Sequence, residues 1–180
     1  GTLRDVVLQV GAQLAQNGFR WTFVVYTHGA PGHAGAIFDA ADAVSDRFHV
    51  TMANLSGTMW SDPARVRESD ALRAHWFTPA QRASMTHDIH AGANETSLVL
   101  AEAPGQVREG WQRLAPVVGD GMLDVFRKAR EPGWPGYVGA PAFASAGYGR
   151  AKLESNVKFD VALVAQALAG DDLRGHPRDD

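Results

Sequence analysis

Apolar residues recur along the first third of the chain at spacings that alternate between helix and strand. Residues 3–14 carry apolar side chains at helical spacing, and Asn17-Gly18 is typical of a helix end. The run Trp21–Tyr26 is rich in aromatic and β-branched residues and predicts a strand buried on both faces. An amphipathic helix around residues 37–44 and a strand at 49–55 follow. This order favours an α/β fold with a mainly parallel sheet covered by helices.

The rest of the chain predicts mostly helices. Ser61-Asp62-Pro63 and Thr78-Pro79 each combine a capping side chain with a proline in the first turn. An apolar helix is expected at 96–103, and a long helix at 153–168. Between them, residues 119–147 are rich in glycine and proline and predict a long ordered loop with one helix at 122–128.

The composition is that of an ordinary globular protein. The 180 residues are 45% hydrophobic and 21% charged, and the net charge is -3 at pH 7. This charge argues against partners that need a basic face, namely nucleic acid and membrane surfaces. The lack of cysteine excludes disulfides and thiolate metal sites, and it fits a reducing compartment, so we expect a cytoplasmic protein.

The loop Thr27–His33 is the first candidate site. It follows the first predicted strand, at the sheet edge where ligands bind in parallel α/β proteins. Its two imidazoles, His28 and His33, belong to the side-chain type that most often binds metals. The same pattern fits a tight turn whose histidines face solvent. A phosphate-binding loop is a weaker alternative, because the glycine spacing matches neither the dinucleotide nor the P-loop pattern.

The segment His87–Ser97 is the second candidate site. Asn94 or Thr96 is expected to cap the apolar helix that follows, which places the Glu95 carboxylate at the helix N-terminus. An imidazole such as that of His90 near a fixed carboxylate is a standard pair for proton transfer. The alternative is a capped helix start with an incidental histidine.

Three segments carry a resemblance to a known family. Residues 90–97 match His-Ala-Gly-x-x-Glu-Thr-Ser at every fixed position, and this motif resembles that of the creatininase family. Residues 27–30 are similar to the family's Asn-Gly-His-Gly-Gly-Asn segment, and residues 139–150 to its Gly-x-Pro-x-x-Ala-Ser-x-x-x-Gly-Arg stretch. The resemblance implies a three-layer α/β/α fold with a mainly parallel central sheet, incomplete at the N-terminus. Residues 1–169 would form the C-terminal part of a single domain, and residues 170–180 a polar, disordered tail.

The resemblance also implies a function. Family members hydrolyse a non-peptide C–N bond of a cyclic or formyl-type amide, with two divalent metal ions (Zn, Mn or Fe). His28 matches a metal ligand, and His90 matches the histidine that moves protons. Glu95 would orient His90 or reach a metal, while Trp60 and His33 would face a small-molecule amide substrate. Core packing is an equal alternative for Trp60. A homo-oligomer, a hexamer in the family, is expected.

Departures from the family pattern qualify this expectation. The family's other metal ligands lie in an upstream Glu-x-His…Asp segment, and we expect a chain that starts at Gly1 to be inactive alone, because catalytic zinc needs three protein ligands. Ala30 and Thr86 stand where creatininase has a glutamate and a tryptophan, which argues against creatinine as the substrate. Two alternatives remain open: a non-catalytic α/β binding or assembly domain, and a maturation factor that acts on a modified peptide.

Overall fold

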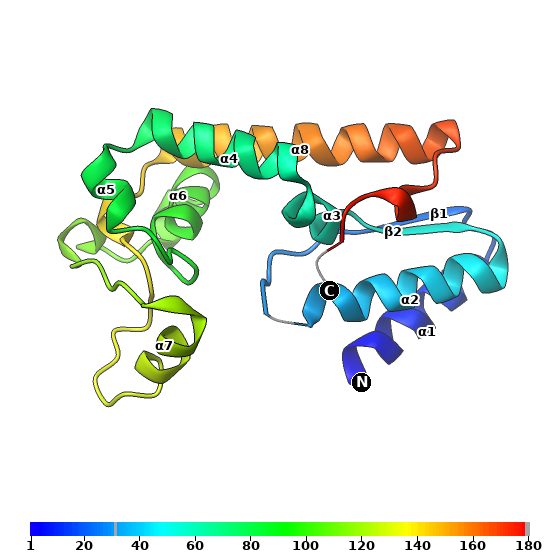
Figure 1. Cartoon of the computed structure of the whole chain (residues 1–180), viewed down its shortest axis with the longest axis horizontal. Helices are drawn as coiled ribbons and strands as arrows, with labels where there is room; N and C mark the ends of the chain where they lie inside the picture. The colour runs from blue at the N-terminus through cyan, green and yellow to red at the C-terminus, as the bar shows by residue number, and fades with distance from the viewer. Residues whose placement is uncertain (31, 179–180) are drawn as a thin grey trace. The chain divides into compact units, whose positions relative to one another are not determined.

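The computed structural model describes residues 1–30 and 32–178 and contains two compact units. Unit 1 comprises Gly1–Arg67 and Asn156–Asp180, and unit 2 comprises Glu68–Ser155. Helices and strands alternate at the start of unit 1, whereas unit 2 is helical with long connections (Figure 1). The elements are α1 (Thr2–Gln16), β1 (Trp21–Val24), α2 (His33–Phe48), β2 (Thr51–Asn54), α3 (Leu55–Ser61), α4 (Pro63–Trp76), α5 (Pro79–Ala83), α6 (Ala93–Glu102), α7 (Gly121–Lys128) and α8 (Ala146–Ala169), with short 3-10 turns η1 (Pro104–Gln106), η2 (Trp111–Arg113), η3 (Pro141–Phe143) and η4 (Leu173–Gly175).

Unit 1 has three layers. β1 and β2 pair in parallel, with Trp21 opposite Thr51 and Val24 opposite Asn54. On one face of this sheet α1 and α2 pack on a core around Ala41, Val44 and Met52. On the other face α8 contributes residues to a second core. That core contains Ala53, Leu55, Leu163, Ala167 and Leu173. The α/β/α layering with a parallel sheet is therefore confirmed within this unit (Figure 1).

A side chain of α2 covers the outer backbone edge of β2. The Thr51 N–H donates to the Arg20 carbonyl at 2.8 Å, so the Met52 backbone groups point away from β1. There the Ser45 hydroxyl accepts from the Met52 N–H at 3.0 Å and donates to the Met52 carbonyl at 3.3 Å. A side chain from α2 thus occupies the outer edge of β2. On β1, Trp21 is 45% exposed and the other three residues are only partly buried, so the expectation of a strand buried on both faces is wrong.

Unit 2 is organised around an aromatic core. This core consists of the buried residues Phe77, Met85, Ala93, Ala140 and Tyr148. The Phe77 and Tyr148 rings meet edge to face, with 4.7 Å between their centroids. The expected helix start at Thr78-Pro79 is confirmed as a capping box, in which Thr78 and Gln81 satisfy each other's backbone N–H groups. The expected helix at 122–128 is also confirmed, as α7.

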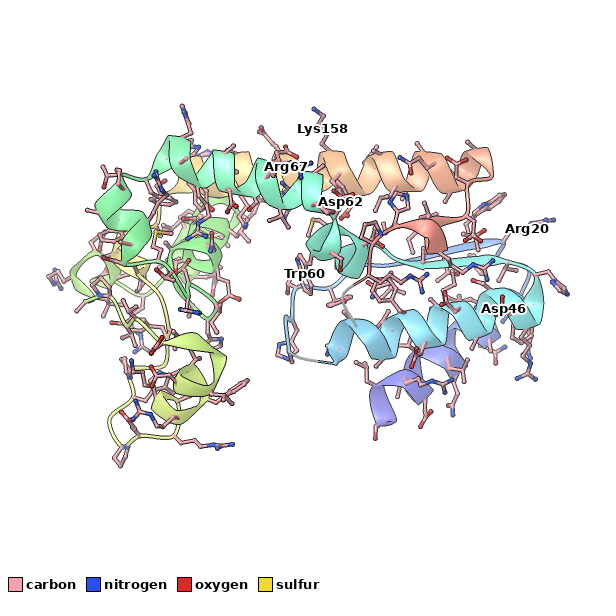
Figure 2. All side chains as sticks on the ribbon, in the orientation of Figure 1. Arg20, Asp46, Trp60, Asp62, Arg67 and Lys158 are labelled. Atoms are coloured by element: carbon pink, nitrogen blue, oxygen red, sulfur yellow. The ribbon has the colours of Figure 1, made fainter. Side chains whose placement is uncertain are left out.

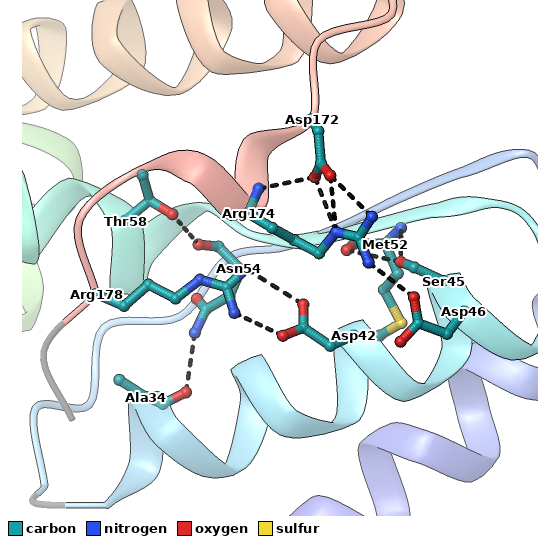
Figure 3. A network of polar contacts seen from close by, with 10 residues as sticks. All are labelled: Ala34, Asp42, Ser45, Asp46, Met52, Asn54, Thr58, Asp172, Arg174 and Arg178. Carbon is teal, nitrogen blue, oxygen red and sulfur yellow. Dashed lines mark hydrogen bonds and ion pairs between the residues drawn. The ribbon is translucent and has the colours of Figure 1, made fainter.

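Residues 170–178 are ordered, although the sequence predicted a disordered tail. Leu173 is 6% exposed within the α8 core. Arg174 forms ion pairs with Asp46 and Asp172, and Arg178 pairs with Asp42 (Figure 3). Burial of one apolar side chain and pairing of both arginines hold this polar segment against α2. Residues 179–180 of the expected tail lie outside the described residues.

The expected single domain, residues 1–169, stays a prediction, because each unit has its own set of contacts. Among the described residues, no helix combines the length and the apolar character that crossing a membrane would require.

Candidate functional site

The loop after β1 carries the first group of predicted site residues. The Tyr26 N–H donates to the Ser56 hydroxyl at 2.9 Å, which fixes the start of the loop against α3. Gly32 adopts a left-handed conformation (φ 74°) that directs the chain into α2 at His33. The exposed His28 ring lies edge to face with the half-buried His33 ring, with 5.1 Å between their centroids. The two imidazoles predicted at this loop are therefore neighbours.

Tyr26 connects the predicted residues, although the sequence did not single it out. Its ring centroid lies 5.0 Å from that of His33 and 5.1 Å from that of Trp60. Its hydroxyl accepts a hydrogen bond from Asn54 Nδ2 at 3.3 Å. Burial raises the pKa of the Tyr26 hydroxyl, and the hydrogen bond from Asn54 partly opposes this rise. Its position at the carboxyl end of a parallel strand, two residues before His28, was the available signal.

Asn54 is the buried polar residue that holds this group in place. It ends β2 and is 2% exposed. Besides the Tyr26 bond, its Nδ2 donates to the Ala34 carbonyl at 3.2 Å (Figure 3). Its Oδ1 accepts from the Gly57 N–H at 2.9 Å. One amide side chain thus joins the β1 loop, the first turn of α2 and the first turn of α3.

Trp60 comes from α3, a helix that the sequence analysis did not predict. Its half-buried indole lies beside the loop that follows β1, at the end of α3 (Figure 2). It meets Tyr26 edge to face, at an interplanar angle of 87°. The structure therefore brings His28, His33 and Trp60 into one aromatic group, with Tyr26 between His33 and Trp60.

A small hollow of about 280 Å³ borders His33. Residues 1–4, Ala30, Gly32 and Ala36 form the rest of its lining. A second cavity of about 420 Å³ lies between α2, β2 and residues 170–178, and none of the predicted site residues lines it. Its two arginines, Arg174 and Arg178, are already paired with aspartates. The hollow at His33 is therefore the better candidate for a reactive site.

The second group of predicted residues lies in unit 2. The His90 and Val138 backbones form an antiparallel bridge. The exposed His90 imidazole stacks on the Trp134 ring, with 6.0 Å between the ring centroids and an interplanar angle of 23°. The Glu95 carboxylate accepts a hydrogen bond from the Ala91 N–H at 2.5 Å. Among the described residues, that carboxylate forms no hydrogen bond with the His90 imidazole. Glu95 therefore supports the backbone just before its own helix.

Asp88 caps α6, where Asn94 or Thr96 was expected to do so. Its carboxylate accepts hydrogen bonds from the Ala93 N–H and the Asn94 N–H, both at 2.8 Å. A third bond comes from the Ala140 N–H at 3.0 Å. The expected cap was wrong because the capping carboxylate is supplied from five residues before Ala93, beyond the usual local pattern.

Glycines of the two motifs make room for this packing. A Cβ added at Gly92 would lie 1.7 Å from Asp88 Oδ1, and one at Gly139 would lie 1.9 Å from it. A Cβ at Gly149 would lie 1.9 Å from the Ser97 carbonyl oxygen. The Ser97 hydroxyl accepts from the Ser145 N–H at 3.0 Å, which ties the two motifs together. Much of the motif sequence therefore serves the packing of unit 2.

The described residues place few metal-binding side chains together. Among the residues that the structure describes, no three or more His, Asp or Glu side chains are grouped so that they could hold a metal. His28 and His33 together offer two imidazole donors, which is fewer than the three protein ligands of a catalytic zinc site. By themselves these two donors do not complete a metal site.

Comparison with protein-family models matches residues 1–164 to the family described as Creatininase: creatinine amidohydrolase. The chain belongs to the creatininase family. The resemblance seen in the residue 27–30, 90–97 and 139–150 motifs is thereby confirmed. Comparison with curated protein sequences finds no match.

Solved creatininase structures share the fold. A creatinine amidohydrolase (creatininase) is 22% identical, with a TM-score of 0.60 over 95% of this chain and 64% of that chain. A glutamate-to-glutamine creatininase mutant of Zn-Zn type is 23% identical (TM-score 0.59; 94% and 64% coverage). A creatininase with Mn is 24% identical (TM-score 0.59; 94% and 65% coverage). At these identities the likeness establishes the creatininase-like fold, and the chain spans less than two thirds of each structure.

Proposed function

We propose that this chain is part of a metal-dependent hydrolase that cleaves the C–N bond of a small cyclic or formyl-type amide. The observation that supports the proposal is the grouping of His28, His33 and Trp60 around Tyr26, at the carboxyl end of β1 in a creatininase-family chain. A ligand imidazole, an aromatic wall and a bordering hollow are the parts that such a site needs.

Each residue has a separate role in this proposal. His28 is a metal ligand, and Trp60 and His33 face the substrate. His90 moves the proton to the leaving nitrogen, while Glu95 fixes the backbone at Ala91 and thereby the direction of His90. The metals, two ions of Zn, Mn or Fe type, would polarise the amide carbonyl and lower the pKa of a bound water. The remaining ligands would come from residues outside this 180-residue sequence.

The wider setting follows the family. We propose a homo-oligomer, with the hexamer as the expected state, and a cytoplasmic location. A reducing compartment is compatible with a sequence that holds no cysteine among its 180 residues.

The test uses a protein that contains this chain and has the full length of the matched creatininase structures. It is loaded with zinc or manganese and assayed against lactams, cyclic ureas, formamides and short modified peptides. We expect metal-dependent hydrolysis of a small amide, lost in His28→Ala and kept in His75→Ala, which alters an exposed histidine on α4. Cleavage of peptides alone would favour the maturation factor. Bound metal without any hydrolysis would favour the non-catalytic domain.

A further inference from the structure

His90 is an exposed side chain whose ring is not held by a polar partner. Among the residues that the structure describes, no hydrogen bond reaches the His90 imidazole, and the Glu95 carboxylate binds the Ala91 N–H instead. A histidine side chain turns about two bonds, and the rotation of its ring has only a broad preference. A group that transfers a proton has to lie within about 2.6–3.2 Å of the atom that receives it. The role proposed for His90 therefore requires another contact that restricts its ring.

The Trp134 indole makes such a contact. It stacks on the His90 imidazole with 6.0 Å between the ring centroids and an interplanar angle of 23°, as offset-stacked aromatic pairs do. This contact lies against one face of the imidazole. Because both ring nitrogens bond in the plane of the ring, stacking leaves them free to accept and to donate a proton. A carboxylate partner would occupy one of the two nitrogens.

Trp134 is itself held in place by a tight turn. Its indole N–H donates to the Tyr137 carbonyl at 3.1 Å, and its backbone N–H donates to the Glu131 carbonyl at 3.1 Å. Pro135 follows it in the sequence and restricts the Trp134 backbone to extended conformations. The indole is thus fixed both by its own hydrogen bond and by the backbone that carries it.

The same turn is joined to the backbone of His90. Tyr137 is 7% exposed, and its hydroxyl donates to the Ala115 carbonyl at 2.6 Å. The next residue, Val138, donates its N–H to the His90 carbonyl at 2.8 Å and accepts from the His90 N–H at 3.2 Å. The two stacked rings therefore belong to backbone segments that are bonded to each other.

We propose that Trp134 is a positioning residue for His90, whose indole face restricts the imidazole to the orientation in which it transfers the proton. This inference rests on the proposed function, because it gives a partner to the proton carrier of that site. Glu95 then acts on the backbone beside His90, whereas Trp134 acts on the His90 side chain. The role needs a flat aromatic face, so Trp134→Phe should preserve it and Trp134→Ala should not.

NMR of the His90 side chain in the 180-residue chain tests the contact in the absence of any reaction. We expect one dominant side-chain rotamer and ring-proton signals displaced by the indole ring current. Trp134→Ala should abolish the displacement and spread His90 over several rotamers, while Trp134→Phe should keep one rotamer. Phe126→Ala, which removes a 45% exposed ring from α7 of the same unit, should change neither. Rotamer averaging in the unchanged chain, or a single rotamer kept in Trp134→Ala, would overturn the inference.

Kinetics of the full-length, metal-loaded protein test the role. A misplacement of about 1 Å can cost about 10²-fold in rate, so Trp134→Ala should lower kcat by up to about 10²-fold, with KM and metal content nearly unchanged. Trp134→Phe should keep most of the rate. In a His90→Ala background, Trp134→Ala should have no further effect, because it acts through His90. An equal loss in both backgrounds would show general damage to the packing and contradict the positioning role.

The remaining outcomes separate this inference from the proposed function. Circular dichroism checks the fold of each variant, and Trp134→Leu, which keeps an apolar side chain without a flat ring, replaces Trp134→Ala if that variant unfolds. If His90→Ala slows the enzyme and Trp134→Ala does not, the inference fails and the role of His90 stands. If His90→Ala leaves the rate unchanged, the role of His90 fails and the positioning role fails with it.

Discussion

The Asp88 carboxylate accepts a hydrogen bond from the Ala140 backbone N–H at 3.0 Å, although 52 positions separate the two residues. The same carboxylate caps α6 through the Ala93 and Asn94 N–H groups. One side chain therefore joins the His90–Ser97 motif to the Gly139–Arg150 motif. The two family motifs of unit 2 are a single packed structure.

Asp88→Ala should destabilise unit 2 strongly. The change removes a helix cap and leaves three N–H groups without their acceptor, for a loss of about 2–4 kcal/mol in unfolding free energy. Chemical denaturation measures it. Asp88→Asn keeps one acceptor oxygen and should lose less. A change within experimental error for Asp88→Ala would show that water replaces the carboxylate at no cost.

Gly139→Ala should be poorly tolerated, while Gly105→Ala should be tolerated. The Gly139 backbone has φ +139°, and an added Cβ would lie 1.9 Å from Asp88 Oδ1. Overpacking of this kind costs about 1–3 kcal/mol, and more where the backbone must move. Nothing lies within 4 Å of a Cβ at Gly105, which makes it the matched control in the same unit. Equal melting temperatures for the two variants would contradict the packing described for Asp88.

His90→Ala and His28→Ala should affect the full-length enzyme differently. Loss of a general acid–base group lowers turnover by about 10²–10⁴-fold, so His90→Ala should do so while metal content stays nearly unchanged. His28→Ala should remove both metal and activity. Metal analysis and steady-state kinetics separate the two effects. Loss of metal in His90→Ala would make His90 a ligand, and an unchanged rate would leave it as part of a capped helix start.

The Asp172–Arg174 pair should add stability at neutral pH and lose it in acid. Hydrogen bonds from Arg174 hold the pKa of the Asp172 carboxyl at about 2, below the value of about 3.9 in an unfolded chain. The contribution is therefore complete above about pH 4 and disappears as pH falls towards 2. The pair is exposed, so we expect at most roughly 1 kcal/mol. Denaturation of Asp172→Asn and of the control Asp171→Asn across this range tests it. If the loss of unfolding free energy in Asp172→Asn does not change with pH, the lowered pKa of Asp172 is contradicted.

Trp21→Lys should reduce aggregation of the isolated chain. Trp21 is 45% exposed on β1, and exposed apolar strand edges promote association between chains, which a lysine opposes. Light scattering during heating measures the effect. Leu123→Lys is the control, because Leu123 is 86% exposed but lies on α7, away from a strand. A monomeric, cooperative transition at high temperature in the unchanged chain would show that the sheet needs no further strand.

Helical periodicity in the sequence predicts most of the helices, but not always which face of a helix is buried. On α8 the apolar residues Val157, Val161 and Leu168 belong to the helical pattern in the sequence, yet they are 51%, 61% and 54% exposed. Leu163 and Ala167 are buried instead. A long helix with apolar residues on more than one side leaves the choice of face to its neighbours. For α3 the reason is different: residues 55–59 are all buried, so no amphipathic pattern marks the helix.

The sequence predicts the histidines of the candidate site but not the residues that hold its segments in place. His28 and His33 follow a strand at the edge where ligands bind, which a sequence can show. Tyr26 read as one more aromatic residue of a buried strand. Asp88 lies too far before α6 to match a local capping pattern. Both act through contacts with distant segments, and sequence spacing carries no record of those contacts.

The buried Asn54 amide has a consequence for motion at this site. Because it binds Tyr26, Ala34 and Gly57 at once, the β1 loop, the start of α2 and the start of α3 open together or stay closed together. Slow hydrogen exchange should therefore extend over all three segments as one cooperative unit. The His28 side chain is exposed and is not bound by Asn54, so we expect it to change rotamer much faster than these three segments open.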